Sequence, residues 1–376
     1  MFLPASLIQI FSKYCVIFSV LYVEPLNYFF INHNNPNKLL RLRLFALFIF
    51  IMCLLDVKAQ DPHFSQFYAS PLTLNPALTG LFAGEGRISS TYRNQWQSIS
   101  NPFTTGTVAF DTRALRRVFK EQNVFGLGGM ALYDQSNNGG LRSRYLAFTA
   151  GYNQQLDKYG HHRLGIGFQA SFVSKTIDYT KFLFSRQFTP IGFDPSLPTG
   201  EPRSTLNVNY PDMGTGILYS GISNTEQQWY IGASYYHITR PNESMTGGEA
   251  KLSPRTTIHA GYNFSANEMS KLYFSGLYMN SAISSEVMLG SIYQQYLDFY
   301  EKKSSVLAGV YYRHNESIIP YAGLESGDIQ IGLSYDINIS SLRTASNSRG
   351  GFELSLQYVF AKDPSKNAVP KCYNKF

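Results

Sequence analysis

Apolar and polar residues alternate one by one in short runs that recur between residues 85 and 360. This period of two predicts β-strands with one apolar and one polar face, because successive side chains on a strand point to opposite sides. A water-soluble β-sandwich would show the same alternation, so the pattern predicts an all-β fold and leaves its surroundings open. The last run, "GFELSLQYVF" (351–360), has on its apolar face Phe352, Leu354, Leu356, Tyr358 and Phe360.

Composition favours a transmembrane barrel over a sandwich. Charged residues make up 15% of the chain, against about a quarter in soluble domains, and aromatic residues also make up 15%. Strands of such barrels are apolar toward lipid and polar toward the lumen. We therefore predict a transmembrane antiparallel β-barrel of about fourteen strands over residues 85–360. Their predicted centres are Tyr92, Val108, Gly128, Phe148, Phe168, Ile217, Ala233, Ala260, Phe274, Leu289, Ala308, Ala322, Leu333 and Leu356.

Residues 38–59 have the layout of a cleaved secretory signal. A basic start from Lys38 to Arg43 precedes the apolar run "LFALFIFIMCLL", and small residues lead to a cleavage site after Ala59. The run is shorter than the roughly 18–20 residues that span a membrane, which disfavours an anchor. Residues 1–37 do not fit this layout. We interpret them as an artefact of start-site choice, and the alternative is a real anchoring helix.

The mature chain would run from Gln60 to Phe376 in the outer membrane, with both ends in the periplasm and residues 361–376 as a tail. Its net charge is +4, because residues 1–59 carry +3 of the chain's +7. A charge this small gives no reason to expect nucleic acid as a partner. An internal disulfide is excluded, because Cys372 is the one cysteine after residue 59.

The segment before the first predicted strand, residues 60–84, is irregular yet apolar. Its stretch "QDPHFSQFYASPLTLNPALTG" holds three X-Pro pairs, which disfavour a helix and a central strand. We predict that it starts at the periplasmic mouth and folds into the lumen as a hatch, because a fourteen-stranded barrel is too wide for its own side chains to fill. Alternatively, it projects into the periplasm and docks on a partner. The hatch or partner-binding candidates are Phe64, Gln66, Phe67, Tyr68, Pro71, Asn75, Pro76 and Ala77.

Polar residues on the inward face of the predicted strands could line a channel or satisfy one another in a closed pore. "GLGG" (126–129) lies inside a strand pattern with no helix after it, so it indicates tight curvature or close packing and not a phosphate loop. The lumen-lining candidates are Arg87, Arg93, Asp111, Gln169 and His259.

The lengths of the connections predict the orientation of the barrel. If both ends of the sheet start in the periplasm, every odd connection is external, and so is the longest one, Thr176–Pro211. Long ordered loops usually carry function, so we predict that this loop recognises a partner. A lid over the barrel mouth is the alternative. The recognition candidates are Phe182, Phe184, Phe188 and Phe193.

No catalytic or metal-binding constellation stands out in the sequence. His161 and His162 fall in a predicted turn, with no carboxylate or cysteine at the spacing of metal ligands. We therefore expect neither enzymatic activity nor a cofactor.

The opening segment resembles the start of mature PorP/SprF proteins, outer-membrane components linked to the type IX secretion and gliding machinery of Bacteroidota. Later stretches such as "FGLGGMALYDQSNNGG" (125–140) and "MGTGILYS" (213–220) are also similar to the family. The similarity covers essentially the whole mature chain except the tail, where Tyr373 and Asn374 replace the family's Pro-Arg. The matching opening residues are Gln60, Asp61, Phe64, Ser65, Gln66, Phe67, Tyr68, Pro71, Leu72, Asn75, Pro76, Ala77 and Gly80.

The resemblance implies a non-enzymatic barrel that assists secretion or surface attachment of partner proteins such as adhesins. It also implies the partners, which are type IX secretion components, a secreted surface adhesin and outer-membrane lipid. An alternative is a channel for small hydrophobic substrates, because residues 75–77 are similar to the hatch motif of fatty-acid-transporting barrels. A third reading is a passive porin or structural protein.

Overall fold

The computed structural model describes residues 61–97, 101–115, 123–201, 205–224, 227–282, 284–298 and 304–360. The predicted leader, signal peptide and tail therefore lie outside the described residues, as do the predicted mature ends Gln60 and Phe376. No helix in the described ranges is long and apolar enough to cross a membrane.

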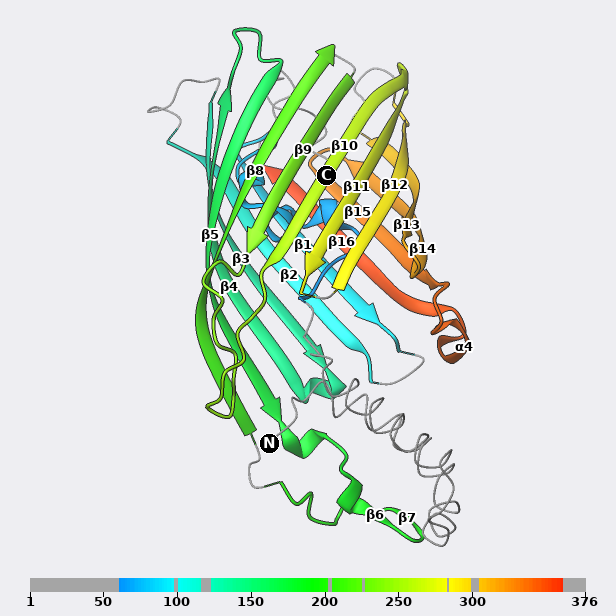
Figure 1. Cartoon of the computed structure of the whole chain (residues 1–376). Helices are drawn as coiled ribbons and strands as arrows, with labels where there is room; N and C mark the ends of the chain where they lie inside the picture. Colours follow the sequence, from blue (N-terminus) through cyan, green and yellow to red (C-terminus); the bar gives the residue numbers. More distant parts are fainter. Residues whose placement is uncertain are drawn as a thin grey trace, which may run out of the picture. The chain divides into compact units, whose positions relative to one another are not determined.

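Fourteen strands in the described ranges pair side by side into a closed antiparallel barrel (Figure 1). Every predicted strand centre lies within its own strand, so the predicted fold class is confirmed. The barrel closes because β1 pairs with β16 along its whole length, from Gly86 opposite Phe360 to Gln95 opposite Gly351. The strands are β1 (Gly86–Gln95), β2 (Phe103–Ala114), β3 (Val124–Ser136), β4 (Leu141–Gln155), β5 (His162–Asp178), β8 (Thr205–Asn224), β9 (Gln227–Tyr236), β10 (Arg255–Asn267), β11 (Ser270–Ser281), β12 (Ser284–Tyr296), β13 (Ser304–Arg313), β14 (Ser317–Ser326), β15 (Ile329–Asn338) and β16 (Arg349–Phe360).

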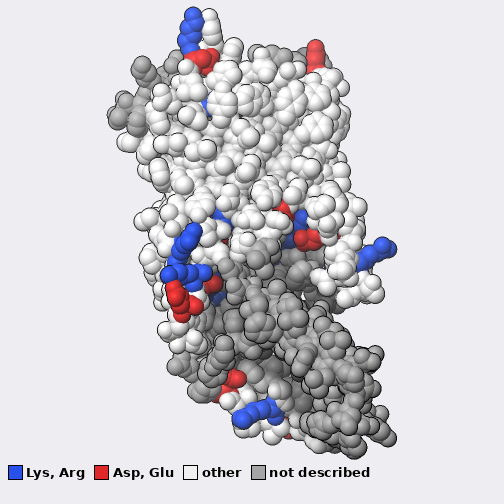
Figure 2. Space-filling view, viewed as in Figure 1, with Lys and Arg blue, Asp and Glu red and all other residues white. Residues whose placement is uncertain are grey.

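The predicted alternation separates an apolar outer face from a largely polar inner face. Val108, Phe148 and Phe168 point outward and expose 57%, 65% and 61% of their surface. Figure 2 shows a broad band of the barrel wall with hardly any Lys, Arg, Asp or Glu, and these residues gather above and below it in this view. A continuous apolar band of this kind is the lipid-facing surface of a transmembrane barrel.

The two ends of the barrel differ in their connections. The three longest, residues 179–204, 237–254 and 339–348, lie at one end, which we name the long-loop mouth. β1 begins and β16 ends at the other end, which we name the terminal mouth.

The predicted bounds of the longest loop, Thr176–Pro211, are wrong at both ends. β5 continues to Asp178 and β8 begins at Thr205, so Pro211 lies inside a strand. The exposed face of this stretch carries Asn207 and Asn209 instead of apolar side chains. Its alternation is inverted, because the apolar residues Leu206 and Tyr210 are buried and face inward.

Short elements occupy the connections and the segment before β1. In that segment, Pro71 and Pro76 each begin a helical turn, where the missing N–H needs no partner, and the Asn75 side chain accepts a hydrogen bond from the Ala77 N–H. The elements are η1 (Phe67–Ala69), α3 (Pro71–Leu74), η2 (Pro76–Leu78), η3 (Asn137–Gly139), η4 (Tyr179–Lys181), η5 (Ser185–Gln187), β6 (Phe188–Thr189), β7 (Gly192–Phe193) and α4 (Arg343–Ser346).

Candidate functional site

Residues 62–84, which we name the plug, lie inside the barrel and are drawn in blue in Figure 1. Phe64, Phe67 and Tyr68 expose 3%, 4% and 1% of their surface, and Leu72 exposes none. Burying one large apolar side chain is worth roughly 1.5–3 kcal/mol. The wall of the lumen therefore gives this segment a burial that it could not obtain in water.

One wall of the lumen is apolar and packs against the first half of the plug, residues 62–70, and also against apolar residues further along it, Leu74, Ala77, Leu78 and Leu81. The Tyr68 ring stacks on Tyr311 with centroids 5.6 Å apart and meets Tyr321 edge-on at 5.8 Å. Phe67 meets Tyr311 edge-on at 6.0 Å. Such ring pairs add about 0.5–1.5 kcal/mol beyond their burial. The strand residues of this wall are Leu218, Tyr230, Tyr273, Leu277, Met288, Ile292, Leu307, Tyr311, Ile319 and Tyr321.

A buried charged cluster, made of Arg93, Glu286, Arg313, Asp336 and Glu353, lies beside the same half of the plug. Asp336 accepts hydrogen bonds from Arg93 at 2.9 Å and from Arg313 at 3.0 Å. Arg313 also donates to Glu286 at 3.0 Å. Buried charges are tolerated where they are paired and hydrogen-bonded, and each member of this cluster has a partner of opposite charge.

The plug is joined to the charged cluster through Ser65 and Gln66. Their backbone N–H groups donate to the Glu353 carboxylate at 2.8 and 2.7 Å. Ser65 Oγ donates to Asp336 at 2.8 Å and accepts from Arg313 at 2.8 Å. The Gln66 side-chain amide donates to the Glu353 carbonyl at 2.9 Å. The plug therefore provides hydrogen-bond partners that water would otherwise have to provide to the cluster.

A second buried ion pair, Arg87 with Asp111, holds the second half of the plug, residues 71–84. The Arg87 guanidinium donates to both carboxylate oxygens of Asp111, at 3.0 and 2.9 Å. Asp111 also accepts from the Gly80 N–H at 2.8 Å, and the guanidinium lies 4.8 Å from the centroid of the Phe82 ring. Two of the predicted lumen-lining residues thus contact the plug and each other.

Asn75 ties the middle of the plug to the strand backbones. Its amide nitrogen donates to the carbonyls of Ile217 at 2.9 Å and Ala233 at 3.3 Å, and lies 3.0 Å from Nε2 of His259. Its oxygen accepts from the Ala77 N–H at 2.9 Å. Because the Asn75 side chain joins two strands to the turn that follows it, the amide group fixes the path of the plug.

Four glycines form a row across neighbouring strands beneath the plug. Gly126 on β3 pairs with Gly151 on β4, Gly151 with Gly167 on β5, and Gly167 with Gly216 on β8. A methyl group added to any of them would overlap or press on atoms of plug residues 75–80. The plug backbone can lie directly on the sheet because these four positions carry no side chain.

This glycine row is the part of the site that sequence reasoning missed. The "GLGG" stretch was predicted to mark curvature or close packing, and Gly126 does pack against Thr79 and Gly80. The row becomes visible in a sequence only after the four strands are aligned in register. Gln169, the remaining lumen candidate, is half-buried on the inward side, and its Oε1 accepts no hydrogen bond from the described residues.

The plug crosses the lumen from one mouth to the other. His63 Nε2 lies 3.1 Å from Glu286 near the start of β12, and Pro62 and His63 line one cleft together with Arg255, the first residue of β10. These strand ends belong to the long-loop mouth. The sequence predicted that the first plug residues lie at the terminal mouth, where β1 begins. In the structure they lie at the long-loop mouth, because the segment spans the lumen once instead of folding back.

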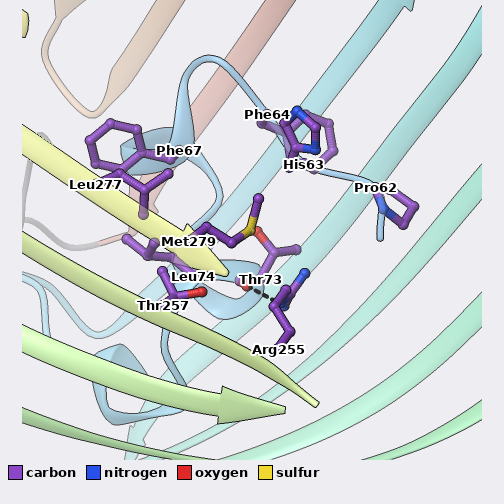
Figure 3. A pocket seen from close by; sticks show the side chains of 10 residues that line it. All are labelled: Pro62, His63, Phe64, Phe67, Thr73, Leu74, Arg255, Thr257, Leu277 and Met279. Atoms are coloured by element: carbon purple, nitrogen blue, oxygen red, sulfur yellow. Dashed lines mark hydrogen bonds between the residues drawn. The ribbon is translucent and has the colours of Figure 1, made fainter. Parts of the chain in front are cut away.

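A small cleft of about 30 Å³ lies between the plug and the strands β10 and β11 (Figure 3). Phe64, Phe67 and Leu277 line it together with Arg255, which donates to the Thr73 carbonyl at 3.4 Å. This volume holds only about two water molecules. The cleft as it stands is too small for a fatty acid or an aromatic hydrocarbon.

Residues 179–201, the described part of the connection 179–204, have local structure of their own. Phe184 stacks on Tyr179 at 6.2 Å, and Phe188 packs on Phe193 at 5.2 Å across the two short strands β6 and β7. The Ser196 hydroxyl and backbone N–H hold the pKa of Asp194 below its usual value by donating to its carboxylate. Phe182 lies against Tyr179 at 6.3 Å, so the four predicted phenylalanines form two groups.

The connection 237–254 folds back onto inward-facing residues of β5 and β8. Glu243 forms an ion pair with Lys175, and Leu252 packs with Val173 and Tyr210. This partial cover of the long-loop mouth was not predicted, because its polar and glycine-rich sequence is typical of an open loop.

Among solved structures, the chain is similar to the toluene transporter TodX of Pseudomonas putida, with 10% identity, 80% of this chain and 95% of that chain covered, and a TM-score of 0.45. A FadL homologue of Pseudomonas aeruginosa matches with 12% identity, 76% and 93% coverage and a TM-score of 0.42. The KdgM porin in complex with oligogalacturonate matches with 9% identity, 73% and 99% coverage and a TM-score of 0.37. No curated protein matches the sequence.

The family model described as type IX secretion system membrane protein PorP/SprF matches residues 56–358. This range includes the plug and almost all of the barrel. The chain therefore belongs to the PorP/SprF family of type IX secretion system membrane proteins.

Proposed function

We propose that this protein is a non-enzymatic outer-membrane accessory that assists the secretion or surface attachment of partner proteins such as adhesins. The observation that carries the proposal is the plug, which contacts several walls of the lumen and is held by two buried ionic sites. A barrel filled in this way is better suited to binding a partner at its surface than to passive diffusion.

In this proposal the long-loop mouth faces outward, because bacterial outer-membrane barrels carry their longer loops outside. The connection 179–204 then meets partner proteins at the cell surface. Its residues Leu183, Phe188 and Ile191 expose 70%, 64% and 99% of their surface. Grouped apolar side chains on an ordered loop are typical of protein interaction sites.

The alternative of a channel for small hydrophobic substrates has less support. The Asn75-Pro76-Ala77 motif does lie in the lumen, but it is packed on the glycine row and bonded to strand carbonyls. Opening a path would require these contacts to break.

The proposal is tested by deleting the gene and comparing the proteins on the cell surface and in the medium with those of the parent strain. Loss of specific surface proteins with unchanged fatty-acid uptake is the expected result. Complementation with a chain in which a short turn replaces residues 179–204 then tests the loop, and heat-modifiable gel migration confirms that this barrel has assembled. Undiminished display of all surface proteins in the deletion strain would refute the accessory role.

A further inference from the structure

The outer wall of the barrel changes from apolar to basic along β4 as this strand approaches the long-loop mouth. Phe148 and Leu146 point outward and expose 65% and 51% of their surface. Tyr145 packs against the apolar cluster inside the barrel, so alternation turns Arg144 and Arg142 outward as well. The lipid-facing side of β4 therefore ends in two cations.

The charge of these two arginines is only partly compensated. Arg144 is exposed and makes no hydrogen bond or ion pair with any residue that the structure describes. Arg142 lies 3.8 Å from the Asp178 carboxylate, and its Nε has no hydrogen-bond partner within the described ranges. Asp178 also accepts a hydrogen bond from Thr180 Oγ1 at 2.6 Å. Two guanidinium groups thus stand beside one carboxylate, and this part of the wall keeps a positive charge.

Uncharged hydrogen-bonding side chains flank the arginines on the neighbouring strands. Tyr133 on β3 and Ser174 on β5 are the register partners of Arg144, and Asn209 on β8 is the register partner of Ser174. Guanidinium groups bind phosphate in a bidentate manner, and hydroxyl and amide groups donate hydrogen bonds to its oxygens. We name Arg142, Arg144, Ser174 and Asn209 the basic row. It offers several donors to one anion.

We propose that the basic row binds the phosphate of an anionic membrane-lipid headgroup. Its position selects a lipid as the source of the phosphate, because the row continues the apolar band on the same strands. Leu146 and Phe172 are register partners that expose 51% and 54% of their surface. A lipid whose acyl chains lie on these two side chains brings its headgroup to Arg144. Its negative charge complements the charge that Asp178 leaves uncompensated. The site lies at the long-loop mouth, whichever side of the membrane this mouth faces.

Native mass spectrometry tests the proposal on the full barrel, released from nanodiscs that contain equal parts of phosphatidylglycerol and phosphatidylcholine. The measured quantity is the amount of each lipid that stays bound. The test variants are Arg144→Gln and the double variant Arg142→Gln with Arg144→Gln. Arg343→Gln is the matched control, because Arg343 is exposed at the same mouth but belongs to the connection 339–348 and not to a strand. Heat-modifiable gel migration confirms that each barrel has assembled.

The parent chain should retain phosphatidylglycerol in preference to phosphatidylcholine. Arg144→Gln should lower the retained phosphatidylglycerol about fivefold, which corresponds to the roughly 1 kcal/mol that one basic residue contributes at an anionic lipid surface. The double variant should lose the preference, and Arg343→Gln should keep it.

Unchanged retention in the double variant would overturn the proposal. An equal loss in Arg343→Gln would do the same, because it would show a general effect of net charge. Displacement of the lipid by an equimolar concentration of inorganic phosphate would show that a free anion satisfies the row, which also contradicts a lipid site. None of these measurements involves a secreted protein, so the lipid site and the accessory role can fail separately.

Discussion

The two halves of the plug are held by different means. The first half, residues 62–70, is bonded to charged side chains that reach in from β1, β12, β13, β15 and β16. The second half has one ion pair, Arg87 with Asp111, and its backbone lies directly on the glycine row. Its carbonyls also accept hydrogen bonds from strand side chains such as Asn153 and Ser234. A charged contact can be exchanged for water or another ligand, whereas a close backbone contact has no substitute. We therefore predict that the first half is released more easily than the second.

Loss of Asp336 should have the largest effect on the first half. Asp336→Ala leaves Arg93 and Arg313 buried without the carboxylate that they share, which should lower the free energy of unfolding by about 3–5 kcal/mol. Urea unfolding of the purified barrel in detergent measures this loss. Asp194→Ala removes a carboxylate in the connection 179–204 and should leave the midpoint unchanged.

Combining Asp336→Ala with thiol probes at two alanines of similar burial tests whether the two halves of the plug are released separately. In the Asp336→Ala background, Ala69→Cys should react with a small thiol reagent while Ala77→Cys stays protected, because they lie in different halves of the plug. Equal reactivity of the two cysteines would mean that the plug is released as one piece.

Filling the glycine row should disturb the second half. In Gly167→Ala the new methyl group overlaps the backbone of Pro76 and Ala77, which should cost about 1–3 kcal/mol of unfolding free energy. Gly129→Ala is the matched control on β3, because its methyl group meets nothing closer than the Ala147 carbonyl at 3.8 Å. Here Ala77→Cys should become the more reactive probe, and protection of that cysteine would show that the close approach is not required.

Asn75→Ala should have a smaller effect at the boundary between the halves. It removes the cap on the Ala77 N–H and the donation to the Ile217 carbonyl, with an expected loss of about 1–2 kcal/mol. Asn242→Ala removes a similar local asparagine contact in an exposed loop, so its unfolding midpoint should change less. A larger change for Asn242→Ala would contradict the role given to Asn75.

The smallest effect is expected at the edge of the charged cluster. Glu316 bonds to Arg313 at 3.1 Å, but 41% of its side chain is exposed. Surface ion pairs contribute little, so Glu316→Gln should change the unfolding free energy by less than about 1 kcal/mol. A loss of unfolding free energy close to that of Asp336→Ala would show that the exposure of a residue does not determine how much its ion pair contributes to stability.

Much of the barrel could be predicted because a period of two says which face each side chain occupies. Arg87, Arg93, Asp111 and His259 were assigned to the lumen from alternation alone, and the structure places all four there in contact with the plug. The charged cluster could not be predicted as a unit. Glu353 lies between the outward residues Phe352 and Leu354, so alternation places it on the inward face, but nothing local links it to Ser65.

The glycine row and the loop bounds needed information that single strands do not hold. The row depends on register between four strands, and register follows from pairing across the whole sheet. The first residues of β8 turn polar side chains such as Asn207 and Asn209 outward, so this part of the strand lacks the apolar outer face that marks the others. Contacts between residues that are distant in sequence were therefore the part of the site that local sequence patterns could not predict.

The contacts of Ser65 and Gln66 with Glu353 join positions 288 and 287 residues apart, near the two ends of the described chain. A growing or truncated chain that lacks β16 also lacks the Glu353 carboxylate that accepts these two backbone hydrogen bonds. Closure of the sheet between β1 and β16 and fastening of the plug thus depend on the same last strand. Because Glu353 lies on the last strand, the first plug residues gain this hydrogen-bond partner only when the chain is complete. A barrel that lacks β16 is therefore open both in its sheet and in its lumen.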